Sequence, residues 1–424
     1  MTEELTPGPA GAHVDAPTMT KAAAGTPLTT LGSHSARPAG DHALSRSPQH
    51  PDARPGLASR VLAFLLTERS LALAAFSVVP LKLIADSPEI GGVGHFGVLT
   101  SFLLVYIFLV VVYAALGVVR HAEQLAEKYG EPYGTLILTI SAVTVEVVML
   151  TTMILHGEND PTLARDTIFA TVMVLLNGLV GLSLLVGGLR YGEQRYNLKS
   201  SKVFLTMLFA LTGLGLVLPD TLTPAQEPDL KVFLVFASLL LYGFFLHVQT
   251  RKHAYFFTFQ ASSATHHASA PERAAIRGAY HMTLLGLTIV AISVLVEYLS
   301  IALDDTVEVL HFPVQLPALI VAIIIASPES LTAIRAALRD DMQRMINIAL
   351  GSALSTIALT IPVVLIITFL VGREIILGLT PAQGGLMVIS LLVASITEAD
   401  GSTSALEGMV QFVLFGAFIL LVFV

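Results

Sequence analysis

Long apolar segments recur along this chain, with short polar segments between them. The pattern predicts eleven transmembrane helices, near residues 70–87, 96–118, 134–156, 167–189, 203–219, 230–249, 279–303, 315–336, 346–371, 384–399 and 408–424. A helix needs about 20 residues to cross the hydrocarbon core of a bilayer, which is close to the length of these segments. The tenth is the weakest, because Thr397, Glu398 and Asp400 crowd its end.

The composition agrees with this pattern. Hydrophobic residues make up 54% and charged residues only 13% of the 424 positions, whereas soluble proteins carry about 25% charged residues. The mean hydropathy is +0.76. The chain has no cysteine, which excludes disulfide bonds, thiolate metal sites and cysteine nucleophiles. We therefore expect an all-α membrane protein.

The basic residues of the loops predict the orientation of the helices. If each segment crosses once, one set of loops holds 13 Lys and Arg residues: Arg120, Lys128, Arg190, Arg195, Lys199, Lys202, Arg251, Lys252, Arg273, Arg277, Arg335, Arg339 and Arg344. The loops on the other side hold only Arg165, Lys231 and Arg373. Because cytoplasmic loops carry the excess of Lys and Arg, the N-terminus is expected in the cytoplasm and the C-terminus outside.

The spans divide into two groups of five that follow an extra first helix. We expect a disordered cytoplasmic tail over residues 1–57, which lack an apolar run, and a peripheral first helix over 58–90. Two five-helix repeats are expected over 91–250 and 278–424, with a cytoplasmic linker over 251–277. Because five is odd, the second repeat enters the membrane from the opposite side, and such inverted repeats place a binding site at the midplane.

A glutamate is predicted near the middle of the third span and another near the middle of the eighth. They are Glu146 and Glu329. A carboxylate at this depth costs several kcal/mol, so it usually faces a protein-lined cavity and has a function. Neither span has a Lys or Arg in its core that would pair with the glutamate. Thr139 falls on the helical stripe of Glu146, and Ser327 stands two residues before Glu329, so both are further candidates.

Pro328 adds an oxygen ligand beside Glu329. Proline has no N–H, so the carbonyl of Ile324 loses its helical partner. Hard cations such as Ca²⁺ take six to eight oxygen ligands from carboxylates, carbonyls and similar groups. We therefore predict a cation site in which Glu146 and Glu329 are the metal-binding carboxylates and also bind protons when the cation leaves.

Other polar residues within the spans are candidates for the same site. Asn177 places an amide side chain in the fourth span, which is a candidate for the cation site. Its alternative role is a hydrogen bond between helices. Ser352 and Ser355 lie in the ninth span on a polar stripe that continues to Thr356 and Thr360. Serine and threonine in membrane helices often bond to a carbonyl of their own helix, which is the structural alternative here.

Four ionisable positions are secondary candidates. Glu297 lies near the outer end of the seventh span and can also reach water. Glu398 and Asp400, with Glu407, lie at the inner junction of the tenth and eleventh spans. They form either a cytoplasmic vestibule that attracts cations or a solvated loop. For the His266–His267 pair in the linker, metal binding or pH sensing competes with a solvated polar segment.

Four segments of the chain resemble known signature motifs. They are Gly130-Glu131-Pro132-Tyr133-Gly134 running to Glu146, then Ser327-Pro328-Glu329, then Arg344 through Asn347 and Gly351-Ser352 to Thr360-Ile361-Pro362, and finally Asp400-Gly401 with Leu406-Glu407-Gly408. Over residues 58–424 the chain resembles the cation/calcium exchanger superfamily. More closely, it is similar to the ChaA-type bacterial calcium/proton antiporters, which also exchange sodium or potassium for protons.

The resemblance implies a ten-helix core of two inverted repeats and one peripheral helix. It implies that Glu146 and Glu329 hold cation and protons in turn, that Asn177 matches the family's asparagine, and that Ser352 and Ser355 match polar positions of the later helix. This chain departs from the family where many members have Gly-Asn before the signature glutamate. It has Ala142-Val143 and Ile325-Ala326 there, so each repeat lacks an amide ligand and the cation shell differs.

These features favour a secondary antiporter of a bacterial cytoplasmic membrane that exports a cation in exchange for protons. Ca²⁺ is the first expected substrate, with Na⁺ and K⁺ as the others. The expected partners are these ions and the lipid bilayer, without a cofactor and without nucleic acid. A cation channel and a non-transporting membrane sensor are the alternatives. An intramembrane enzyme is disfavoured, because the sequence has no His-Glu-x-x-His and no Gly-x-Ser-x-Gly motif.

Overall fold

The computed structural model describes residues 64–85, 98–130, 133–156, 160–223, 225–252 and 274–424. The predicted tail and the two linker histidines lie outside these residues. The α-helices are α2 (Arg69–Ala85), α3 (Val98–Tyr129), α4 (Tyr133–His156), α5 (Leu163–Met173), α6 (Val180–Tyr191), α7 (Leu198–Thr212), α8 (Glu227–His247), α9 (Ala274–Leu310), α10 (Leu316–Ala337), α11 (Met342–Ser355), α12 (Ile361–Val371), α13 (Pro381–Thr397) and α14 (Ala405–Phe423).

Short segments of other structure extend or interrupt these helices. Four are π-helices: η1 (Val174–Leu179), η2 (Gly213–Val217), η4 (Val248–Lys252) and η7 (Thr356–Thr360). A 3₁₀-helix, η3 (Leu218–Thr221), ends the segment that starts with α7. Two short strands, β1 (Gln194–Arg195) and β2 (Ser402–Thr403), pair antiparallel. The protein is therefore an all-α membrane protein, as the sequence predicts.

Each predicted span corresponds to a helix or to a run of consecutive helical segments. Among the described residues, nine of these are long and apolar enough to cross a membrane. The other two are α13 and α2, with 17 residues each. Two helices are longer than their apolar cores, because α3 and α9 continue into polar sequence beyond the predicted bounds of 118 and 303.

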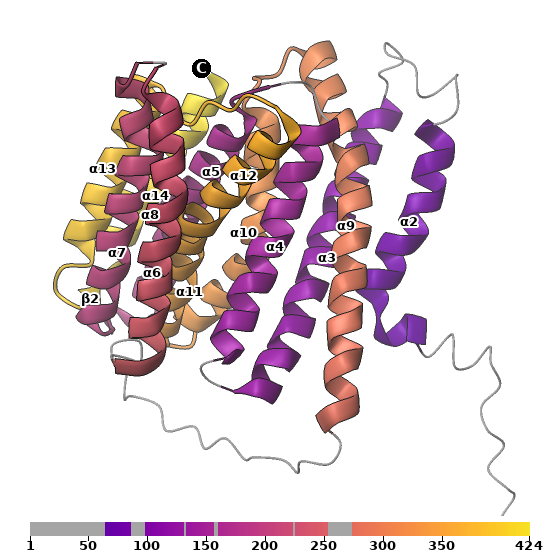
Figure 1. Ribbon diagram of the computed structural model, residues 1–424. Coiled ribbons are helices and arrows are strands. Elements are labelled where there is room, and N and C mark those ends of the chain that lie inside the picture. Colours follow the sequence, from indigo (N-terminus) through magenta and orange to yellow (C-terminus); the bar gives the residue numbers. More distant parts are fainter. Residues whose placement is uncertain (1–63, 86–97, 131–132, 157–159, 224, 253–273) are drawn as a thin grey trace, which may run out of the picture. The chain divides into compact units, whose positions relative to one another are not determined.

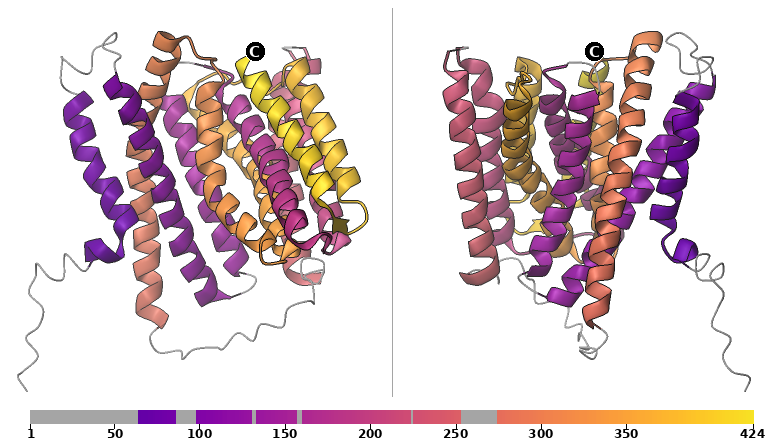
Figure 2. Two further views of the ribbon diagram at one scale, coloured as in Figure 1. Left: turned by 180° about the vertical axis from the view of Figure 1, so that it is seen from behind. Right: turned by 45° about the vertical axis from the view of Figure 1, so that its right-hand side comes forward.

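The helices run side by side, and the chain passes back and forth along them (Figures 1 and 2). One end, which we call the basic end, holds the α6–α7, α10–α11 and α13–α14 connections. The β1–β2 pair and a hydrogen bond of 3.1 Å from Gln194 Nε2 to the carbonyl of Ala337 join these connections. At the opposite end, Ile376 N donates to the carbonyl of Pro161 at 2.9 Å. Among the described residues, Arg190, Arg195 and Lys199 lie in or next to the α6–α7 connection and Arg339 in the α10–α11 connection, so they lie at the basic end.

An ion-pair network attaches α2 to the rest of the helices. Glu68, which directly precedes α2, is only 3% exposed. Its carboxylate accepts hydrogen bonds from Arg120 of α3 and, at 2.6 Å, from the hydroxyl of Tyr280 on α9. Next to it, the Nδ1 atoms of His121 and His281 lie 3.0 Å apart. The first helix is therefore held by polar contacts to α3 and α9, which start the two predicted repeats.

Glycines allow α6 and α14 to pack closely. A Cβ atom on Gly181 would lie 2.7 Å from the backbone nitrogen of Phe412. A Cβ atom on Gly408 would lie 2.8 Å from the carbonyl oxygen of Gly181 and would overlap the backbone nitrogen of Leu185. Small residues permit such close approach of membrane helices. The contact places α14 against the helix that continues from η1.

Gly408→Ala is expected to lower the free energy of unfolding by about 1–3 kcal/mol, because the new methyl group forces α6 and α14 apart. Gly416→Ala on the same helix is the control, since a Cβ there meets nothing within 4 Å. The control is expected to be neutral or to stabilise by up to about 1 kcal/mol. Thermal unfolding of both purified variants in detergent measures the difference. Equal melting temperatures would contradict the close α6–α14 contact.

Candidate cation site

Two long helical spans are interrupted by a π-helix at similar places. One is α5–η1–α6 in the first half of the helical core, and the other is α11–η7–α12 in the second half. These are the corresponding helices of the two predicted repeats. A π-helix inserts a wider turn, loosens the regular hydrogen-bond pattern and is frequent at functional sites. Asn177 lies in η1, and Thr356 and Thr360 lie in η7.

Glu146 lies in the middle of α4 and faces the second π-helix. It is 2% exposed. Thr356 Oγ1 donates a hydrogen bond of 2.9 Å to Glu146 Oε2. Thr360 also interacts with this carboxylate. The Glu146 Oε1 atom and the Thr360 Oγ1 atom are buried without a hydrogen-bond partner of normal geometry. The site thus leaves oxygen atoms of α4 and η7 unsatisfied at the same place.

Glu329 lies on α10, directly after Pro328, which is inside the helix. The α10 helix packs against α5 and against η1, the first π-helix. The side chain as a whole is partly exposed, but its Oε2 atom is buried and has no hydrogen-bond partner. Glu146 and Glu329 are close enough for their charges to interact. The structure therefore brings together the two glutamates that the sequence singled out.

Asn177 is fully buried in η1 and contacts a helix of the other half. Its Nδ2 atom donates to Ser390 Oγ on α13 at 2.7 Å and lies 3.4 Å from Met173 Sδ. Its Oδ1 atom has no partner. Ser390 is 0% exposed and was not a candidate from sequence. A serine in the middle of the weakest predicted span was the available signal, but one serine alone rarely indicates a site.

The chemistry of this cluster is that of an oxygen site without a fixed positive charge. Among the described residues, neither carboxylate forms an ion pair with a basic side chain. The unsatisfied atoms are carboxylate, amide and hydroxyl oxygens, which hard cations prefer. The part of the chain that the structure describes contains no group of three or more His, Cys, Asp or Glu side chains able to hold a metal ion. A cation here would combine two carboxylates with neutral oxygens.

Three of the hydroxyl groups expected beside the glutamates form hydrogen bonds with other groups. Ser327 Oγ donates to the carbonyl of Ile323, and Ser355 Oγ donates to the carbonyl of Ser352, so both bond within their own helices. Thr139 pairs with the hydroxyl of Tyr242 on α8. The hydroxyl that reaches Glu146 belongs to Thr356, the next residue after Ser355.

Of the secondary candidates, Glu297 lies on α9 and the others lie at the α13–α14 junction. Glu297 is half-buried in α9. Glu398 follows the last residue of α13 and is 1% exposed. Asp400 is exposed, and its Oδ1 atom accepts a hydrogen bond of 3.1 Å from Ser402 N. Glu407 forms a capping box with Ser404 at the start of α14. The junction of α13 and α14 thus combines one buried carboxyl with two that have structural contacts at the surface.

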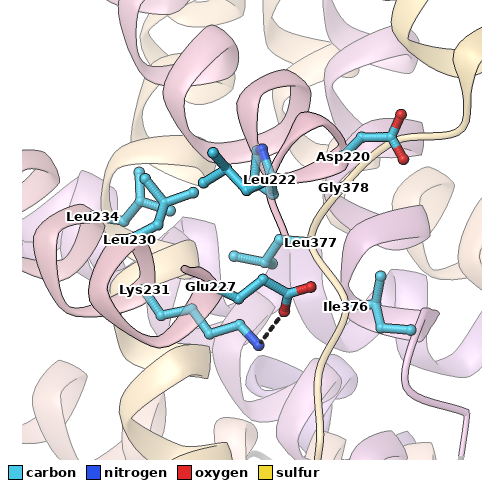
Figure 3. A pocket seen from close by; sticks show the side chains of 10 residues that line it. Asp220, Leu222, Glu227, Leu230, Lys231, Leu234, Ile376, Leu377 and Gly378 are labelled. Carbon is cyan, nitrogen blue, oxygen red and sulfur yellow. Dashed lines mark ion pairs between the residues drawn. The ribbon is translucent and has the colours of Figure 1, made fainter. Parts of the chain in front are cut away.

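A hollow of about 130 Å³ lies away from this cluster, between η3, α8 and the segment before α13 (Figure 3). Glu227 and Lys231 line it and form an ion pair of 3.1 Å. Lys231 also donates to the carbonyl of Ile375 at 2.9 Å. None of the predicted site residues lines this hollow, which belongs to the end opposite the basic end.

The sequence matches a family of cation exchangers. The model of the family described as "Sodium/calcium exchanger protein" matches residues 99–251 and 280–424. The chain belongs to the sodium/calcium exchanger family. The two matched segments begin and end within a few residues of α3–η4 and of α9–α14, and they leave out α2. Members of this family are secondary transporters rather than enzymes, and so is this exchanger.

Two relatives indicate which members of the family this exchanger is similar to. The exchanger is 37% identical over 310 residues to the putative ionic transporter y4hA of Sinorhizobium fredii, a match that covers 72% of this chain and 83% of the relative. It is 35% identical over 316 residues to the sodium-potassium/proton antiporter ChaA of Escherichia coli, covering 73% and 86%. The resemblance to ChaA-type antiporters is confirmed.

Solved structures support the fold. The exchanger aligns with native YfkE at a TM-score of 0.65 and 19% identity, covering 84% of this chain and 99% of the other. It aligns with the H⁺/Ca²⁺ exchanger CAX at a TM-score of 0.57 and 15% identity, covering 82% and 89%. At these identities the likeness concerns the fold alone.

Thr356→Val is expected to destabilise the exchanger by about 1–3 kcal/mol, because Glu146 then loses its hydrogen-bond donor and stays buried. Thr368→Val is the control, since Thr368 is equally buried in α12 but bonds to carbonyls of its own helix. Thermal unfolding in detergent compares the two variants. The difference should disappear when both are made in a Glu146→Ala background. If it persists there, Thr356 acts independently of Glu146.

Proposed function

We propose that this exchanger exports a cation in exchange for protons and binds both, in turn, at Glu146 and Glu329. The observation that carries the proposal is the pair of interacting carboxylates, each with a buried oxygen that lacks a partner. A buried charge without a partner is too costly to persist in a membrane protein. Each carboxylate must therefore hold a proton or face a bound cation. Such a requirement couples the two ions.

The exchange cycle follows from this competition. Protons that arrive from outside neutralise Glu146 and Glu329 and release the cation there. After the site becomes accessible from the cytoplasm, a cation displaces the protons and restores neutrality. Neither ion can leave unless the other takes its place, because an empty site with ionised carboxylates is unfavourable. Thr356, Thr360 and Asn177 supply neutral oxygens on the two π-helices for the cation-bound state.

The arrangement of the two halves supports alternating access. Glu146 comes from the first half and faces η7 of the second, whereas α10 with Glu329 packs against η1 of the first. Groups from both halves therefore surround Glu146, and the helix that carries Glu329 packs against the first half. A movement of one half against the other changes the surroundings of both carboxylates, as the proposed inverted repeats at residues 91–250 and 278–424 require.

The proposed substrates are Ca²⁺, Na⁺ and K⁺. The name of the relative ChaA gives sodium and potassium, and that of a relative in Aphanothece halophytica, 22% identical, gives calcium. All three are hard cations that suit an oxygen site. We place the exchanger in a bacterial cytoplasmic membrane with its basic end in the cytoplasm, because loop lysines and arginines stay on that side.

Reconstituted liposomes test the exchange directly. Purified exchanger is placed in vesicles that carry a pH gradient and an internal pH dye, and Ca²⁺, Na⁺ or K⁺ is added outside. We expect at least one cation to dissipate the gradient and to accumulate against its own gradient. Glu146→Gln and Glu329→Gln should each abolish this exchange. Glu123→Gln, an exposed residue of α3, should exchange like the wild type.

The same assay separates the alternatives. A cation channel would let the ion run down its own gradient without accumulation driven by protons. A membrane sensor would give no flux of either ion. Normal exchange by both glutamine variants would refute the two-carboxylate site, even if the wild type proves to be an antiporter.

A further inference from the structure

A third carboxyl group is buried near the basic end, away from Glu146 and Glu329. Glu398 is the first residue after α13 and is 1% exposed. Both of its carboxylate oxygens are buried without a hydrogen-bond partner. A buried carboxylate usually accepts hydrogen bonds or pairs with a basic group. Glu398 does neither, and the cation site described above does not use it.

The α13 helix, which ends directly before Glu398, links this residue to the cation site. Ser390, which bonds Asn177, and Ala394 are both fully buried on this helix, and Thr397 is 6% exposed. Glu398 follows this buried face eight residues after Ser390. At 1.5 Å per residue the two positions are about 12 Å apart along the helix. One buried face of α13 therefore runs from the candidate cation site to Glu398.

Other unsatisfied polar groups lie over the same length. Ser183 on α6 and Gln411 on α14 are 0% exposed, and their polar side-chain atoms have no hydrogen-bond partner among the described residues. Ser183 lies between Asn177 and the basic end along the α5–η1–α6 span. The α14 helix packs against α6, η1 and α13. Buried polar side chains are thus present between the candidate cation site and Glu398.

In the part of the chain that the structure describes, the carboxylate of Glu398 forms no ion pair with a basic side chain. The hydroxyl of Tyr196, 4% exposed, is also without a hydrogen bond, and it interacts with the charges of Glu398, Asp400 and Glu407. Tyr196 N donates to the carbonyl of Gly401 at 3.0 Å, which holds this loop against the α13–α14 junction.

Helix α7 also contacts this position. Ser201 Oγ lies 3.5 Å from the carbonyl oxygen of Glu398, a contact to the backbone rather than to the carboxylate. The helix begins with two lysines, Lys199 and Lys202, from which the Glu398 carboxylate accepts no hydrogen bond. Among the described residues, Tyr196 interacts with the charge of Glu398, and Ser201 contacts its backbone.

Burial favours the protonated form of this group. It raises the pKa of Glu398 to about 8 and also raises the pKa of Tyr196. A carboxyl with this pKa carries a proton at neutral pH and releases it as the cytoplasm becomes alkaline. It can therefore exchange protons with water under conditions that a cell meets.

We propose that Glu398 is a proton-binding group of the exchanger, which transfers protons between the cytoplasm and the site of Glu146 and Glu329. Its role in transport rests on the function proposed above, whereas its protonation does not. Glu398 first releases its own proton to water at the basic end, and its carboxylate then accepts the proton that the midplane carboxylates release. Removal of the carboxyl leaves the cation site intact and slows the proton step.

Infrared difference spectroscopy tests the protonation. Purified Glu146→Gln/Glu329→Gln protein is titrated through the range around pH 8, so that neither midplane carboxyl contributes. We expect the loss of one buried carboxylic-acid band with a midpoint near that pH. The band should be absent when Glu398→Gln is added and should remain when Asp400→Asn, which changes an exposed carboxylate of the same loop, is added instead. No such band, or its loss with Asp400→Asn, overturns the proposal.

Exchange in liposomes tests the role in transport. Glu398→Gln alone is expected to keep cation affinity but to exchange severalfold more slowly at alkaline internal pH, and to lose the change in rate around pH 8. Glu398→Asp should restore this change, because it retains a carboxyl. A wild-type pH profile for Glu398→Gln would overturn the relay. If the wild type exchanges no protons at all, the proposed function fails, and the infrared result still decides the protonation of Glu398.

Discussion

The structure depends on the cost of a buried negative charge. Two glutamates at mid-helix positions interact with each other, have unsatisfied oxygens and lack a basic partner among the described residues. A lysine or arginine beside the glutamates would neutralise this charge permanently, and the site would then not need to bind another ion. In the exchange proposed above, a mobile ion therefore neutralises Glu146 and Glu329, and the competition between a proton and a metal cation follows from this constraint.

The π-helices η1 and η7 lie next to the helices that carry the two glutamates. Each interrupts a long helix of one half and packs against a carboxylate-bearing helix of the other half. Thr356 donates directly to Glu146, and Asn177 connects η1 to Ser390 on α13. Because these two hydrogen bonds cross between the halves, the geometry of the site depends on how the halves are arranged. The close glycine packing of α6 against α14 is another contact between the halves.

The sequence predicted the membrane helices and the two glutamates because both signals are strong: apolar length and charge at an unfavourable depth. It did not predict which hydroxyl of the ninth span reaches Glu146. Ser352, Ser355, Thr356 and Thr360 share a stripe at regular α-helical spacing, but η7 widens the turn and changes which residue points at α4. The contact of Ser390 could not be predicted, because its partner, Asn177, is 213 residues away in sequence. The predicted ends of α3 and α9 were wrong, because both helices continue beyond their apolar cores.

The central claim is that cation and protons compete for one pair of carboxylates, and proton release on cation binding measures this most directly. Purified exchanger in weakly buffered detergent solution is titrated with Ca²⁺, Na⁺ or K⁺ while the pH is recorded. The account predicts that a bound cation releases protons, and that Glu146→Gln/Glu329→Gln protein releases none. Cation binding without proton release, or equal release from the double variant, would contradict it.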